Sequence, residues 1–284
     1  MSRTIPYDPT RRALYKPCAD AISLDPRAAR NEALLCAELS RLIYCPFEQG
    51  ESMQQEIMSQ LAGIGFSHPP QFFDKNGLQA CFAVDPNKQI GVLVYRGTQS
   101  NGWKDIIANL KAAHASWDGS GCVHNGFANM LKGAWADIQA ALDASSANRI
   151  LYTGHSLGAA LATLSAALRR PDALYTFGSP RVGDAEFAAS MTDVMHERYV
   201  DCCDGVPTVP PASWSYEHVG ELKYIDQNGM LGTAISPADI ESDQREAEKQ
   251  FALQYALQQP ANALLRSAAD HAPVNYIHAL RTLR

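Results

Sequence analysis

The residues best suited to chemistry in this chain form the motif Gly154-His155-Ser156-Leu157-Gly158. An apolar run precedes the motif and an Ala/Leu-rich run follows it, so the sequence predicts a strand, a sharp turn with a serine at its tip, and a helix. The two glycines remove the Cβ atoms that would clash in such a turn. The start of the helix directs backbone N–H groups at the same place, which suits an oxyanion. The motif therefore predicts Ser156 as a nucleophile.

A serine hydroxyl is a weak nucleophile at neutral pH, so Ser156 needs a histidine base and an acid that orients the base. In α/β-hydrolases the acid, and then the histidine, follow the serine in the chain. Asp204 is the best placed acid, because a short β-branched and aromatic stretch ends there and a Gly/Pro-rich loop begins. Asp201 would lie inside the strand, where a structural role is expected. Asp184 has the position of an N-cap for a following helix.

Three histidines follow Asp204 and are candidates for the base. His271 lies on a loop just before a helix whose first turn would hold Pro273, so it would be free to swing onto the serine. His278 falls inside that helix, where a packed or surface role is the simpler interpretation, and His218 precedes a strand-like segment. We predict His271 as the base and keep His218 and His278 as alternatives.

A tetrahedral intermediate needs more than one donor for its oxyanion, because the loss of one donor typically costs about a hundredfold or more in rate. The backbone N–H of Leu157 is the first predicted donor. Thr98 is the second, because an apolar strand stops at Arg96-Gly97 and a polar loop begins. Without the serine motif, a simple turn of the chain would be the preferred interpretation of Thr98.

Several separated blocks of sequence agree in order and spacing with one known family. They are Tyr95-Arg-Gly-Thr98, Val123-His-Asn-Gly-Phe127, Gly154-His-Ser-Leu-Gly158, Tyr175-Thr-Phe-Gly-Ser-Pro-Arg-Val-Gly-Asp184, Asp204-Gly-Val-Pro207 and Asp270-His271. Over roughly residues 92–280 the chain resembles the class 3 lipases, the fungal-lipase-like family of α/β-hydrolases. The resemblance implies an acyl-enzyme mechanism on acylglycerol esters. It implies the same roles as the chemistry, with nucleophile Ser156, acid Asp204, base His271 and oxyanion donors Thr98 and Leu157.

The segment after Thr98 carries apolar residues at helical spacing with polar residues between them. The apolar residues are Trp103, Ile106, Ile107 and Leu110. A short amphipathic helix beside an oxyanion donor could cover an acyl pocket in water and open onto a lipid surface, and the resemblance implies such a lid. A helix packed permanently on the core is an equally good interpretation.

The wider pattern predicts an α/β-hydrolase fold, with a central, mostly parallel sheet that starts antiparallel and has helices on both faces. Strands are expected at residues 71–74, 78–85, 89–96, 149–153, 173–177 and 198–201, and helices at 126–142, 157–169 and 184–195. Tight turns such as Asn76-Gly77 join the first strands and make them antiparallel.

We expect a single domain over residues 1–284, with a helical lead-in at 1–65 and a polar helical excursion at 236–269 inside it. In the lead-in, Asp25 has the character of a cap for one helix. Residues 52–55 fit a capping box for a second helix.

Composition and charge narrow the function classes. The 284 residues are 46% hydrophobic, which is enough for one large α/β core, and a net charge of −6 disfavours nucleic acid as a partner. No run approaches the ~20 apolar residues of a transmembrane helix, and the first residues lack the apolar segment of a signal peptide. A cytoplasmic location is therefore expected, with export by a signal-independent route left open.

Cysteine usage indicates thiols rather than a disulfide framework. Seven cysteines cannot all pair, and Cys202 and Cys203 are adjacent, so free thiols in a reducing compartment are expected. No cysteine or histidine spacing resembles a zinc site. Neither a metal nor another cofactor is expected.

The loop after the acid is predicted to line the acyl pocket through Val206, Pro207, Val209 and Trp214. The expected partner is a lipid or small ester substrate, with transient contact to a lipid surface through the lid. A phospholipase A1 or a feruloyl-type esterase would use the same catalytic residues with a different pocket. Two other hypotheses stay open: a catalytically silent lipase-like scaffold, and a secreted toxin that degrades a competitor's lipids.

Overall fold

A seven-stranded sheet organises the chain in the computed structural model, which describes residues 7–18, 30–98, 114–118, 120–232, 235–256 and 258–281. The strands, in spatial order, are β1 (Gln71–Lys75), β2 (Leu78–Asp85), β3 (Ile90–Tyr95), β6 (Arg149–His155), β7 (Ala173–Phe177), β8 (His196–Asp201) and β9 (Glu221–Ile225). β1 to β3 pair antiparallel, and β3 to β9 pair parallel. The prediction of a mostly parallel sheet with an antiparallel start is confirmed.

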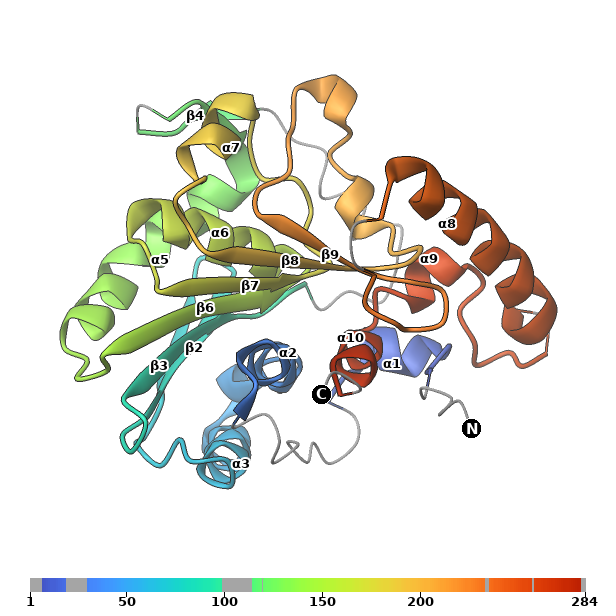
Figure 1. Ribbon diagram of the computed structural model, residues 1–284. Coiled ribbons are helices and arrows are strands. Elements are labelled where there is room, and N and C mark those ends of the chain that lie inside the picture. Colours follow the sequence, from blue (N-terminus) through green and yellow to red (C-terminus); the bar gives the residue numbers. More distant parts are fainter. Residues whose placement is uncertain are drawn as a thin grey trace.

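Helices cover both faces of this sheet (Figure 1), so the central strands are buried on both sides, as every residue of β7 shows. One face carries α5 (Asn125–Asp143), α6 (Leu157–Leu168) and α7 (Ala185–Ser190), and the other carries α2 (Glu32–Leu42), α3 (Glu51–Ala62) and α10 (Pro273–Leu280). Successive side chains of a strand enter opposite cores. On β6, Leu151 packs in the core of the α2 face and Tyr152 in the core of the α6 face.

Two helix starts differ from the prediction. α2 begins after Asn31, whose side chain accepts a backbone N–H, and the predicted cap at Asp25 lies outside the described residues. α3 begins after Gly50 without a side-chain cap, so the capping box predicted at residues 52–55 is wrong. The chain enters this helix earlier because Gly50 has a φ of 133°, a conformation open to glycine.

A small second sheet was not predicted. It pairs β4 (His114–Ser116) with β5 (Cys122–His124), and an isolated bridge joins Val123 to Gly183 near the start of α7. Asp184 caps α7 as predicted, since its side chain accepts the N–H of Phe187 at 2.9 Å. The helix ends at Ser190, earlier than predicted, because the chain must turn into β8.

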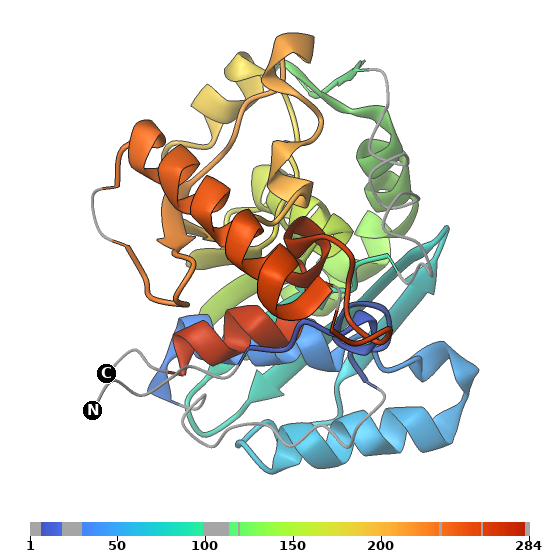
Figure 2. The ribbon, with the colours of Figure 1, turned by 90° about the vertical axis from the view of Figure 1, so that its right-hand side faces the viewer.

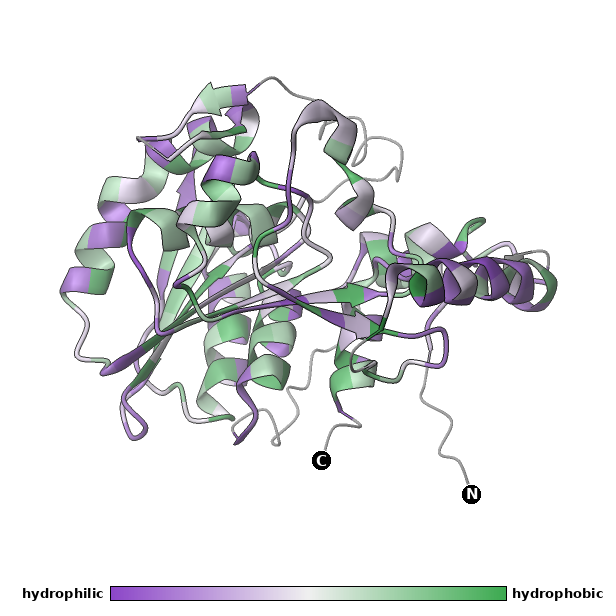
Figure 3. Cartoon of the chain, turned by 45° about the horizontal axis from the view of Figure 1, so that its top comes forward, coloured by the Kyte–Doolittle hydropathy of each residue, from purple (hydrophilic) through white to green (hydrophobic). Residues whose placement is uncertain are grey.

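The C-terminal third contains the helical excursion. It comprises α8 (Pro237–Phe251), a π-helical turn η5 (Ala252–Ala256) and α9 (Arg266–Ala269). Figure 2 shows α8 crossing in front of the sheet, and Figure 3 shows that most of this helix is hydrophilic. Ala247 and Phe251 are its buried residues. Among the described residues, none of the helices combines the length and apolar character needed to cross a lipid bilayer.

Segments from opposite ends of the sequence lie side by side. α1 (Arg11–Tyr15) follows a bridge between Thr10 and Asn262, and it packs near α9 and α10. The N-terminal segment therefore contacts the part of the chain that carries His271.

Candidate active site

The turn between β6 and α6 holds Ser156 in a conformation that side chains rarely adopt. Its φ is 59° and its ψ is −127°, and its N–H donates to the carbonyl of Phe177 at 3.0 Å. Such backbone conformations cost of the order of 1–3 kcal/mol and cluster at functional sites. The predicted strand, turn and helix are therefore present, with the serine at the tip.

Both glycines of the motif are required by close packing. A Cβ on Gly154 would lie 2.3 Å from the backbone of Gly158, and a Cβ on Gly158 would lie 2.2 Å from the carbonyl oxygen of Tyr95. The helix after Ser156 thus packs directly against the end of β3. Its first N–H groups, which have no partner inside the helix, lie beside the segment that leads to Thr98.

Asp204 and His271, predicted as acid and base, meet in the folded chain. Nδ1 of His271 lies 2.8 Å from Oδ2 and 3.0 Å from Oδ1 of Asp204. Because an ionised carboxylate only accepts, Nδ1 carries the proton and Nε2 holds the lone pair of a base. Both side chains are almost fully buried, so solvent screens their interaction little.

Tyr276 contacts Asp204, although the sequence did not predict this contact. Its hydroxyl donates to Oδ2 of Asp204 and accepts the N–H of Asp201 at 3.2 Å. Burial, reinforced by the charge of Asp204, raises the pKa of Tyr276, so the phenol stays protonated as a donor. With Nδ1 of His271 and the N–H of Val206, Tyr276 gives the carboxylate of Asp204 three donors. Its position in the helix directly after His271 could have indicated from the sequence that Tyr276 lies near the site.

His155, inside the serine motif, is a second missed residue. Its Nε2 lies 2.8 Å from the carbonyl oxygen of His271, and its Nδ1 lies 2.8 Å from the hydroxyl of Tyr44. The ring centroids of His155 and His271 are 4.4 Å apart. Burial lowers the pKa of His155 well below its usual value, and His271 adds to the effect. A neutral His155 therefore donates from Nε2 to the carbonyl oxygen of His271.

Thr98 follows the end of β3 and is half-buried. The preceding residue packs tightly, since a Cβ on Gly97 would lie 2.7 Å from the carbonyl oxygen of His155. The segment with Thr98 is thus held against the residue before Ser156. Leu157 is the first residue of α6. The roles of Thr98 and Leu157 as oxyanion donors stay predictions.

The residues predicted to line the acyl pocket differ in how far they are exposed. Val206 and Pro207 are buried, with Val206 in the core of the α6 face, whereas Trp214 is 47% exposed. Val209 and Asp204 lie at a pocket of about 350 Å³. The acyl-pocket role of these residues stays a prediction. The predicted lid residues Trp103, Ile106, Ile107 and Leu110 lie outside the described residues.

Asp201 and His218, which the sequence offered besides Asp204 and His271, lie in surroundings that disfavour their charged forms. Burial raises the pKa of Asp201 well above its usual value, which favours a neutral carboxyl. Burial and the nearby Arg198 lower the pKa of His218. In the described part of the chain, His271 is the candidate histidine that contacts Asp204. The structure thus brings together the preferred pair.

Comparison with known proteins finds relatives of the segment that holds the serine turn. Residues 92–214 match the family described as lipase (class 3). The chain is 36% identical over 179 residues to the secreted mono- and diacylglycerol lipase 1 of Fusarium solani, covering 58% of this chain and 53% of that protein. It is 34% identical over 133 residues to the toxin TseL of Vibrio cholerae, covering 44% of this chain and 21% of that protein. The chain spans about half the length of the first curated relatives it matches.

A solved structure agrees with the fold. The triacylglyceride lipase of Rhizomucor miehei superposes with a TM-score of 0.58 at 26% identity, covering 69% of this chain and 80% of that chain. The predicted α/β-hydrolase fold is therefore confirmed.

The expected cytoplasmic location is wrong. The matched Fusarium solani enzyme is named as secreted, which speaks against the cytoplasmic expectation. The first residues of the printed sequence are therefore no guide to the compartment.

Proposed function

We propose that this chain, which belongs to the class 3 lipase family, hydrolyses carboxylic esters of acylglycerols. Ser156 acts as the nucleophile, His271 as the base and Asp204 as the acid. One observation carries the proposal: a serine strained at the start of a helix, in a fold that also orients the proton on His271 toward a buried carboxylate. A scaffold that had lost catalysis would have no need for this arrangement.

Acylation begins when Nε2 of His271 takes the proton from the hydroxyl of Ser156 and Oγ attacks the ester carbonyl. The imidazolium that forms is stabilised by Asp204, whose carboxylate Tyr276 holds in place. His271 then returns the proton to the leaving alcohol. Water attacks the acyl-enzyme in the second half of the cycle, with His271 again as the base.

The carbonyl oxygen of the substrate gains negative charge as the bond forms. The N–H of Leu157, at the positive end of the α6 dipole, is the proposed first donor to this oxygen. Thr98 is the proposed second donor. Fixed donors of this kind stabilise the transition state without reorganising when the reaction occurs.

The substrate class rests on the relatives. The Fusarium solani protein is named a mono- and diacylglycerol lipase and the Rhizomucor miehei protein a triacylglyceride lipase. We extend an acylglycerol substrate to this chain on that basis. Transient contact with a lipid surface through the predicted lid belongs to the same proposal.

The test is hydrolysis of p-nitrophenyl esters from C2 to C16, beside emulsified triglyceride and phospholipid. Ser156→Ala should abolish hydrolysis, and Ser59→Ala, at an exposed position of α3, is the matched control. The preferred chain length and the ratio of triglyceride to phospholipid turnover separate a lipase from an esterase and a phospholipase A1. An inactive unmodified chain, or an active Ser156→Ala variant, would refute the serine mechanism.

The match to TseL favours a second candidate, a secreted toxin whose hydrolysis damages the lipids of another cell. Expression of the chain in the periplasm of a bacterial host tests this candidate. Growth arrest that disappears in Ser156→Ala would support a toxin. Normal growth with active enzyme in the periplasm would speak against it.

A further inference from the structure

Hydrogen bonds from the N-terminal segment hold the loop that carries His271. The hydroxyl of Tyr7 donates to Oδ1 of Asp270 at 2.5 Å. The N–H of Asp8 donates to Oδ1 of Asn275 at 2.9 Å, and Nδ2 of Asn275 donates back to the carbonyl of Asp8 at 3.1 Å. These contacts lie on either side of His271, so the segment holds the loop at two points.

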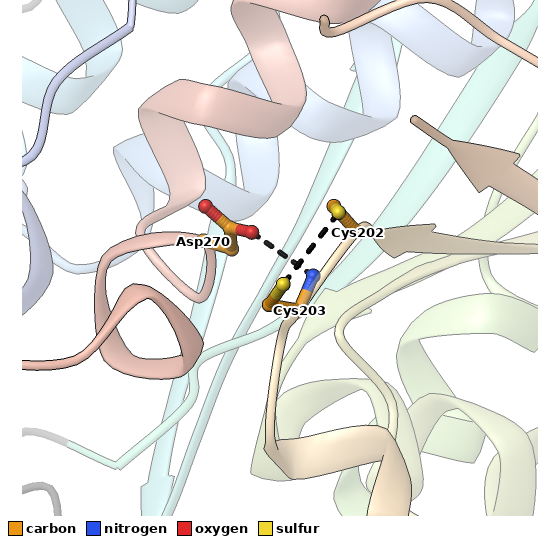
Figure 4. Close-up of side chains that lie close together, drawn as sticks. All are labelled: Cys202, Cys203 and Asp270. Carbon is orange, nitrogen blue, oxygen red and sulfur yellow. Dashed lines mark hydrogen bonds between the residues drawn. The ribbon is translucent and has the colours of Figure 1, made fainter. Parts of the chain in front are cut away.

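Asp270 is the centre of this arrangement. It is fully buried, and its Oδ2 accepts the N–H of Cys203 at 3.0 Å and Nε of Arg266 at 3.0 Å. Figure 4 shows the carboxylate of Asp270 directed at the backbone nitrogen of Cys203. Cys203 precedes Asp204 in the chain, and Asp270 precedes His271. One hydrogen bond therefore ties the loop of the acid to the loop of the base, one residue before each.

We propose that Asp270 is a positioning residue of the hydrolytic site, and that Tyr7 acts on the site through Asp270. This inference rests on the proposed function, because it assigns Asp270 the task of holding Asp204 and His271 in reacting geometry. A shift of either loop would move Nδ1 of His271 relative to the carboxylate. Small displacements of catalytic groups lower the rate steeply.

The partners of Asp270 oppose the effect of its burial. Burial raises the pKa of Asp270, whereas Arg266 and the donated hydrogen bonds of Tyr7 and Cys203 lower it. Arg266 is itself fixed, because it lies over the ring of Tyr7 at 5.5 Å and donates to the carbonyl of Gln227 at 3.0 Å.

The same cluster has the spacing of a metal site, which its chemistry does not favour. Donor atoms of Cys202, Cys203 and Asp270 lie within 4.8 Å of one another. Metal binding needs thiolates, but the hydrogen bond with Cys203, followed by burial, raises the pKa of Cys202. Oδ2 of Asp270 is also engaged with Arg266 and a backbone N–H. The cluster therefore suits a hydrogen-bonded junction.

Two graded variants and a matched control test the proposal. Tyr7→Phe removes one hydroxyl and keeps the ring, and Asp270→Asn keeps the shape of the side chain and removes its charge. Tyr255→Phe is the control, because its ring lies 5.9 Å from that of Tyr7 while its hydroxyl makes no hydrogen bond among the described contacts. The readouts are kcat and KM on a soluble p-nitrophenyl ester, and the downfield proton resonance of Nδ1–H of His271.

We expect kcat to fall about threefold in Tyr7→Phe, which removes one hydrogen bond to Asp270, and about thirtyfold in Asp270→Asn, which replaces one acceptor oxygen by a donor opposite Tyr7 or Arg266, with KM unchanged in both. Tyr255→Phe should stay within about twofold of the unmodified chain. The His271 resonance should shift or broaden in the same order. Because Tyr7→Phe keeps the packed ring, we expect it to fold, so the proposal can be tested even if Asp270→Asn does not fold.

The two proposals fail in different ways. An unmodified chain that hydrolyses no ester refutes the proposed function, and the His271 resonance then still decides whether Asp270 positions the base. Unchanged kcat and an unchanged resonance in Tyr7→Phe would overturn the positioning role. A rise in KM alone would overturn it as well.

Discussion

The turn that holds Ser156 is stabilised by close packing of backbone atoms, whereas the loop that holds His271 is held by side chains from distant parts of the sequence. In the turn, the two glycines of the motif fit against each other and against β3. In the loop, the partners are Tyr7, which bonds Asp270, and His155 and Asp204, which bond His271. A steric fit admits no substitution, whereas a set of hydrogen bonds can lose one member and keep the rest.

This difference separates two kinds of mutational effect. Changes at the serine turn should alter stability and rate together, because the backbone itself must move. Changes at the base loop should alter the rate more than the stability, because the fold survives while the geometry of His271 loosens.

The largest effect is expected for Gly158→Ala, which breaks the serine turn. The added Cβ would lie 2.2 Å from the carbonyl oxygen of Tyr95, so the free energy of unfolding should fall by about 3 kcal/mol and ester hydrolysis should be lost. Urea unfolding and p-nitrophenyl ester turnover measure the two effects. Gly232→Ala is the matched control, because its nearest neighbour would be 3.6 Å away. A stable, active Gly158→Ala protein would contradict the steric account.

The next effect concerns pH and the residue that links the two regions. Because the pKa of His155 is lowered in the folded chain, the unfolded chain binds a proton more readily, near pH 6.5. The stability from neutral His155 is thus complete above pH 6.5 and is lost as the pH falls below it. At pH 5 the loss should be about 2 kcal/mol. His155→Gln should lack this part of the pH dependence when the free energy of unfolding in urea is measured at pH 5 and at pH 7.5. The same difference in free energy between the two pH values for both proteins would refute this prediction.

The smallest effect is expected for Tyr276→Phe, which sharpens the comparison from the side of the base. It removes one donor to Asp204 and leaves the ring packed. We expect kcat to fall about tenfold, which corresponds to about 1.4 kcal/mol, with little change in the thermal midpoint. Tyr199→Phe, whose hydroxyl bonds Glu197 away from the site, is the control. A fall in the thermal midpoint of Tyr276→Phe without a fall in kcat would show that Tyr276 stabilises the fold and does not position Asp204.

The sequence predicted what local pattern determines. The serine turn follows from five adjacent residues, and the pairing of Asp204 with His271 follows from the chain order of the fold. His155, Tyr276 and Asp270 escaped because their partners are far away in sequence, so no local pattern marks them. The start of α3 was missed because Gly50 replaces the expected side-chain cap. The lid, the acyl pocket and a single domain over residues 1–284 stay predictions.

The pairing of Tyr7 with Asp270 spans 263 positions of sequence. On a ribosome that adds about 5–20 residues per second, the first partner waits roughly ten seconds or more for the second to emerge. The strands and helices around Ser156 are complete well before that. A nascent chain therefore presents Ser156 before His271 has been added, and hydrolytic competence waits until the segment that carries His271 has emerged.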